Sequence, residues 1–74
     1  MHTKTFAAIY QKDEAGWSAL CPELDVASQG ATLEEAQANL REAVELLFDA
    51  ASPAELERRL KTETLLTQLE VNIG

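Results

Sequence analysis

Alternation of apolar and polar residues marks the first strand of this chain. Residues 3–11 are apolar on both sides of an extended backbone, since Phe6 and Tyr10 would lie on one face and Ile9 on the other. A two-sided pattern of this kind is typical of a strand that has a neighbour on each side. We therefore predict that the first strand lies in the interior of a sheet.

A hairpin and a short third strand are expected next. The polar residues 12–16 form a turn that includes a glycine, and residues 17–21 resume the extended pattern. Pro22 ends the second strand because it has no N–H and restricts the residue before it. A third strand is expected at 26–28, and Gly30 would supply permissive backbone for the turn into a helix.

Two helices are marked by their first turns. Thr32 begins a capping box, in which its hydroxyl accepts from first-turn amides and Glu35 reaches back to the Thr32 N–H. Ser52 and Pro53 repeat this start and predict a short peripheral helix that ends at about Thr62. The first helix carries an apolar stripe wide enough to pack on a sheet, formed by Leu33, Ala36, Leu40, Ala43, Val44, Leu47 and Phe48.

The end of the chain predicts one more strand, from Gln68 to Ile73, because apolar and β-branched residues recur there. A strand that follows a right-handed helical crossover would lie beside the first strand and parallel to it. We therefore predict an α+β fold with a four-stranded sheet of order 3-2-1-4, one long helix on one face and a short second helix. A second copy of the chain would cover the other face.

Composition limits the size and chemistry of the protein. With 74 residues the chain has room for one domain, which we take to span residues 1–74. Cys21 and His2 are the only cysteine and histidine, so one chain can build neither a disulfide framework nor a thiolate or imidazole metal cluster. Many apolar residues are alanines, which bury little area, and a dimer or larger assembly is therefore expected.

The charge balance bears on partners. The chain has 13 acidic and 6 basic residues, for a net charge of −7. Direct nucleic-acid binding is not expected, because contacts to phosphates require clustered Lys and Arg. The same charge would steer a basic partner toward the protein, although solubility explains it equally well. We see no leader and no apolar run long enough to cross a bilayer, so we expect a cytoplasmic protein.

Catalytic residues are not evident. A two-metal site needs several carboxylates that converge from a central strand and its neighbours, and residues 6–11 contain none. Cys21 has no plausible general base, because His2 lies near the terminus. We therefore predict that the protein is not an enzyme and uses no metal or cofactor.

One continuous pattern links the hairpin to the long helix. It consists of Gly16-Trp17-Ser18-Ala19-Leu20, Cys21-Pro22-Glu23-Leu24, Ser28-Gln29-Gly30, Thr32, Glu34-Glu35-Ala36 and Asn39-Leu40-Arg41-Glu42-Ala43. The pattern resembles the amino-terminal domain of the HicB-like antitoxins, and the similarity extends to about Asp49. Two departures are visible, since Asp25-Val26 stands where many relatives have Pro-Gly, and Ala31 replaces a residue that is often acidic.

The resemblance implies a partial ribonuclease-H-like fold that binds and masks a small basic HicA-type toxin, which cleaves mRNA. Many relatives also carry a carboxy-terminal DNA-binding domain, which we do not expect in these 74 residues. An acidic oligomeric adaptor, or a small-ligand-binding domain without a toxin partner, is the alternative. A neighbouring reading frame for a small basic protein would favour the antitoxin.

Three residues are candidates for contact with a protein partner: Trp17, Glu23 and Asp25. Trp17 offers a large amphipathic surface, although packing on the sheet explains it as well. Glu23 and Asp25 lie in an acidic turn that would steer a basic partner during encounter. Leu46 interrupts the polar face of the long helix, but a single exposed leucine needs no functional explanation.

Overall fold

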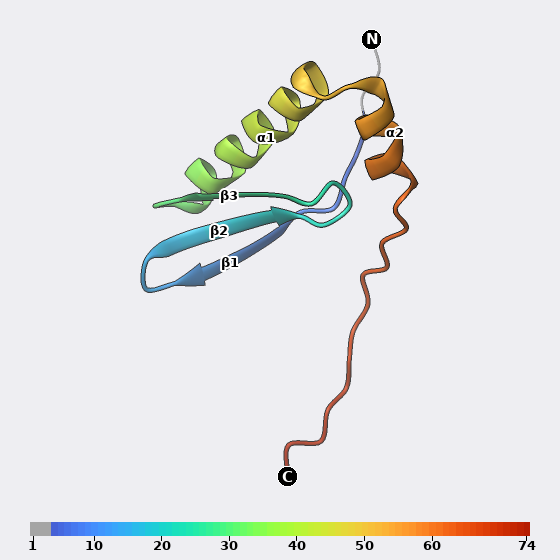
Figure 1. Cartoon of the computed structure of the whole chain (residues 1–74). Coiled ribbons are helices and arrows are strands. Elements are labelled where there is room, and N and C mark those ends of the chain that lie inside the picture. The colour runs from blue at the N-terminus through green and yellow to red at the C-terminus, as the bar shows by residue number, and fades with distance from the viewer. Residues whose placement is uncertain (1–3) are drawn as a thin grey trace.

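A computed structural model describes residues 4–74 of the chain. Three strands precede two helices, in the order β1 (Ile9–Asp13), β2 (Gly16–Cys21), β3 (Val26–Gly30), α1 (Leu33–Ala50) and α2 (Pro53–Lys61). The strands form an antiparallel meander of order β1-β2-β3, and α1 packs mainly on β3 and β2 (Figure 1). The molecule is thus one three-stranded sheet with a long helix on one face.

The predicted hairpin is present between β1 and β2. Its register places Tyr10 opposite Ala19 and Asp13 opposite Gly16. The Asp13 carboxylate accepts the Ala15 N–H at 2.8 Å, which closes the turn locally. Gly16 has a φ of +131°, a conformation that side chains with a Cβ rarely adopt. Local turn chemistry therefore sets the register of the first two strands.

The core lies between the sheet and α1. Side chains alternate along β2, so that Ala19 and Cys21, each 2% exposed, face α1 while Leu20 points to the opposite face. Among the described residues, five hydrophobic side chains are buried there: Ala19, Cys21, Leu24, Ala36 and Leu40. The opposite face of the sheet is open to solvent.

The capping box of α1 forms with one difference from expectation. The Thr32 hydroxyl accepts the Glu35 N–H at 3.1 Å, as predicted. The Glu35 carboxylate, however, accepts the N–H of Ala31 at 3.3 Å, and not that of Thr32. The first half of the predicted apolar stripe faces the sheet, with Ala36 and Leu40 buried in it.

The end of β3 is joined closely to α1. A Cβ at Gly30 would lie 2.5 Å from the Ala36 backbone nitrogen, so glycine is required there by close packing. Its φ is not positive, which corrects the expectation that its conformational freedom is what matters. The Asn39 side chain also donates to the Gln29 carbonyl at 2.8 Å. These contacts fix the angle at which α1 leaves the sheet.

The second helix is held against the turn between β2 and β3. Its predicted start is confirmed, because the Ser52 hydroxyl accepts the Glu55 N–H at 3.2 Å. Arg59 forms an ion pair with Glu55 at 3.1 Å and also donates to the Leu24 carbonyl. A single side chain thus connects α2 to the buried part of the turn.

The predicted fourth strand is not formed, and the four-stranded sheet of order 3-2-1-4 was wrong. None of the described residues after Lys61 is in a helix or strand, and this segment leads away from the rest of the molecule (Figure 1). The strand β1 is therefore an edge strand and not an interior one. Apolar alternation favours an extended backbone, but pairing depends on where the rest of the chain places an acceptor edge. Thr3, the first residue of the predicted strand, lies outside the described residues.

Candidate functional site

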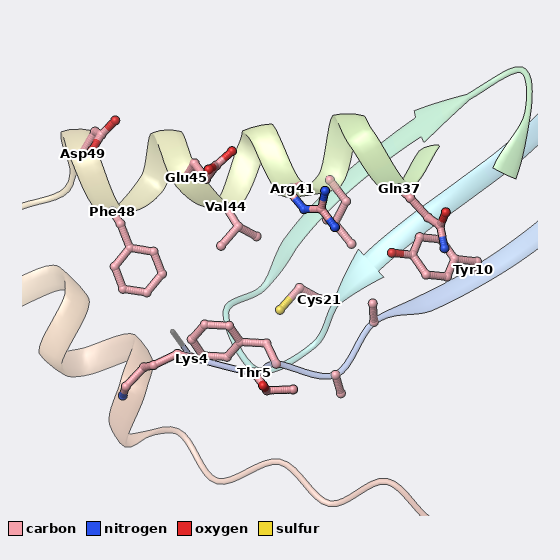
Figure 2. Close-up of a pocket in the computed structure, with 14 residues that line it drawn as sticks. Lys4, Thr5, Tyr10, Cys21, Gln37, Arg41, Val44, Glu45, Phe48 and Asp49 are labelled. Atoms are coloured by element: carbon pink, nitrogen blue, oxygen red, sulfur yellow. The ribbon is translucent and has the colours of Figure 1, made fainter. Parts of the chain in front are cut away.

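A groove runs between α1 and the extended segment that leads into β1 (Figure 2). Its volume is about 910 Å³. Val44 and Phe48 line it from the helix, Phe6 lines it from the opposite segment, Tyr10 lines it from β1 and Cys21 lines it from β2. The second half of the apolar stripe of α1 therefore faces a groove, while the first half is covered by the sheet.

The groove is apolar inside and balanced in charge around it. The rings of Phe6 and Phe48 lie 6.0 Å apart between centroids and are tilted by 32°. The charged lining residues are two basic and two acidic ones: Lys4, Arg41, Glu45 and Asp49. Such a groove suits an apolar side chain or strand better than it suits an ion.

The structure shows no metal-binding constellation in the part of the chain that it describes. Among residues 4–74, no three His, Cys, Asp or Glu side chains lie close enough together to hold a metal ion. Cys21 is 2% exposed and packs in the apolar core. His2, the only histidine, lies outside the described residues.

Trp17 lies at the hairpin end of β2 and is half-buried against the core. Together with Asp13, Glu35 and Asn39 it lines a second hollow of about 380 Å³. This end of the sheet is near the start of α1, because Trp17 pairs with Gly30 across β2 and β3. Part of the tryptophan is thus available for contact beside acidic side chains.

The acidic turn lies at the other end of β2. Glu23 and Asp25 follow Cys21, which is four residues beyond Trp17 and therefore about 13 Å away along the strand. The structure does not bring the tryptophan and the acidic turn into one patch. The three candidate residues therefore belong to two separate surfaces.

Glu23 has a structural contact that the sequence did not indicate. Its half-buried carboxylate accepts the N–H of Ala7, which holds the segment before β1 against the turn. Asp25 is exposed and has a φ of +55°, in the left-handed region that Asp tolerates better than most residues. Of these two residues, Asp25 is the exposed one, and Glu23 is half-buried.

The outer surface of α1 is a further candidate for partner contact. Five exposed acidic side chains of this helix form what we call the acidic face: Glu34, Glu35, Glu42, Glu45 and Asp49. The only basic residue of α1 is Arg41. Leu46 is 57% exposed and lies next to Glu42 and Asp49 at helical spacing. Sequence reasoning treated this surface as ordinary solvated helix, although the excess of acidic over basic residues was already a signal.

No helix within residues 4–74 has the length and apolar character needed to cross a membrane. No protein-family model matches the chain, and no curated protein or solved structure shows significant similarity to it.

Proposed function

We propose that this chain is a non-catalytic cytoplasmic domain that binds and masks a small basic protein. The observation that carries the proposal is the acidic face of α1, which has five acidic side chains while the helix has one basic residue, and which includes the exposed Leu46 between Glu42 and Asp49. The resemblance to HicB-like antitoxins in residues 16–49 indicates the class of partner, a HicA-type toxin. Masking would then be stoichiometric and would need no reacting group.

The acidic face combines the two features that capture of a basic protein requires. Exposed carboxylates raise the rate of encounter with a positive surface. A large apolar side chain among them provides an anchor that loses water on binding and slows dissociation. Leu46 fits the second role, because its neighbours Glu42 and Asp49 would form a charged rim around it.

The groove beneath α1 is a weaker candidate for a basic partner. Its charged lining residues are balanced, with Lys4 and Arg41 opposing Glu45 and Asp49. A balanced rim provides little net attraction for a positive surface. The acidic turn is also limited, because the Glu23 carboxylate already accepts a hydrogen bond from Ala7.

The test is the association kinetics of the purified chain with a small basic HicA-type protein, such as one encoded beside it. Neutralising Glu42→Gln with Asp49→Asn should slow association about tenfold and leave dissociation almost unchanged. Leu46→Ala should mainly speed dissociation. The matched control is Glu57→Gln, since Glu57 is exposed on α2 and lies outside the acidic face.

The acidic turn is tested in the same assay by Glu23→Gln with Asp25→Asn. Glutamine keeps an acceptor for the Ala7 N–H, and asparagine tolerates the left-handed backbone, so this pair removes charge without disturbing the turn. Association rates that respond to neither set of substitutions nor to salt would reject capture by charge.

A further inference from the structure

The segment after α2 has the side-chain pattern of a strand with one apolar face. We call residues 63–74 the tail. Its odd positions from Leu65 to Ile73 are apolar except for Thr67, and the positions between them are polar after Leu66. This period of two places nearly all large apolar side chains on one side of an extended backbone.

The apolar face of the tail is in water. Leu65 is 84% exposed, Leu69 is 87% exposed and Ile73 is 94% exposed. Leu66 and Val71 are also exposed, at 53% and 66%. Five large apolar side chains within nine residues form a surface that soluble chains normally cover by association.

The same molecule carries an edge and a groove that would accept such a strand. Within the described residues, β1 pairs only with β2, so its outer edge has free backbone donors and acceptors. The groove lined by Phe6, Val44 and Phe48 opens beside the segment that enters this edge (Figure 2). A strand added to an edge gains backbone hydrogen bonds and places alternate side chains into pockets.

Charge is compatible with this arrangement. The tail has two acidic residues, Glu63 and Glu70, and no basic residue. The groove is lined by two cations, Lys4 and Arg41, and by two anions, Glu45 and Asp49, so its rim is balanced in charge. Glu70 is on the polar side of the tail and would lie at the charged rim of the groove, whereas Glu63 shares the odd positions of the apolar side chains.

We propose that the tail of one copy docks as a strand along the β1 edge and groove of a second copy, and that the exchange is reciprocal. The tail leads away from its own sheet, which presents it to another molecule (Figure 1). Each copy has one tail and one β1 edge beside the groove, so a two-fold exchange closes as a dimer with neither of these left over. Each chain keeps its own three-stranded meander, and the four odd-numbered large apolar side chains of each tail leave water, which makes eight per dimer.

The experiment measures the mass of the full chain by analytical ultracentrifugation over a dilution series. The wild-type protein should be a dimer at micromolar concentration. Leu69→Glu with Val71→Glu should raise the dissociation constant about a hundredfold or more, because both charges would enter the apolar groove. Gln68→Glu with Asn72→Asp adds the same charge on the polar side and should change it less than about threefold.

Circular dichroism checks that each variant is folded, which is expected because the tail lies outside the buried core. A monomer at every concentration would overturn the proposal, including a monomer whose β1 amides are protected by its own tail. A dimer that is equally stable in both double variants would also overturn it, because the two copies would then associate through another face. A dimer lost only in the Leu69 and Val71 variant supports it.

Discussion

Three single residues between the end of β2 and the start of α1 have roles that their own backbone conformation or immediate contacts explain. Gly30 leaves room for the backbone of α1, and Glu23 accepts a hydrogen bond from the segment before β1. Asp25 adopts a left-handed backbone in the turn between β2 and β3. In each case the type of residue is explained by local geometry, so a contact with a partner is not needed to account for it.

The substitution Gly30→Ala tests whether the close approach of β3 to α1 requires glycine at this position. Alanine lowers the conformational entropy of the unfolded chain, which by itself would stabilise the protein by about 0.4–1 kcal/mol. A Cβ at 2.5 Å from the Ala36 nitrogen costs more, because the neighbour is backbone and cannot turn aside. We expect a net loss of about 1–3 kcal/mol in the free energy of unfolding, measured in urea.

Ala27→Ser is the control for this substitution, since Ala27 is exposed in the same strand. It should change the free energy of unfolding by less than about 0.5 kcal/mol. A Gly30→Ala protein as stable as the wild type would mean that β3 and α1 do not approach so closely.

At the scale of elements, the helices were predictable and the sheet was only partly so. The starts of α1 and α2 depend on Thr32 and Ser52, whose hydroxyls act within three residues of themselves. The hairpin likewise depends on Asp13 and Gly16 in one turn. The contact of Arg59 with the Leu24 carbonyl spans 35 residues, and no sequence pattern indicates such a contact.

Arg59 provides a test of how α2 is held. Arg59→Met keeps much of the aliphatic length but removes the bond to Leu24 and the ion pair with Glu55, so we expect a loss of about 1–2 kcal/mol in stability. Lys61→Met is the matched control, because the ion pair of Lys61 with Glu57 is exposed and contributes little.

Amide hydrogen exchange should distinguish the Arg59→Met variant from the Lys61→Met variant, as should unfolding in urea. In the Arg59 variant the amides of α2 should exchange faster than those of α1, since α2 would detach from the turn before the core opens. Equal effects of the two substitutions would show that Arg59 acts only as an exposed helix charge.

At the scale of the whole molecule, the prediction that residues 68–73 form a strand paired with the first one was wrong, since no strand follows Lys61 among the described residues. Alternation from Leu65 to Ile73 is local information, whereas the location of a free edge is known only once β1 is placed. The same limit applies to the candidate site. Trp17 and Asp25 are near each other in sequence, yet Trp17 lies near the start of β2 and Asp25 lies beyond its end, so the length of this strand separates them.

Net charge makes the two proposed associations respond to salt in opposite directions. Each copy carries a charge of −7, so two copies repel each other, while a basic partner is attracted. Raising NaCl from about 0.05 M to about 0.5 M shortens the screening length from more than 10 Å to less than 8 Å. Self-association should therefore tighten with salt, and capture of a basic protein should slow.

Ion pairs between a docked tail and the groove would oppose the tightening of self-association by salt. Contacts of Glu70 with Lys4 or Arg41 would weaken in salt, but exposed pairs of this kind contribute at most about 1 kcal/mol each. Repulsion between two strongly acidic molecules should outweigh them. Sedimentation of the chain alone and stopped-flow mixing with the basic protein, in the same buffers, measure the two trends. If both associations weakened together as salt rose, the dimer would depend on charge pairs and not on the apolar face of the tail.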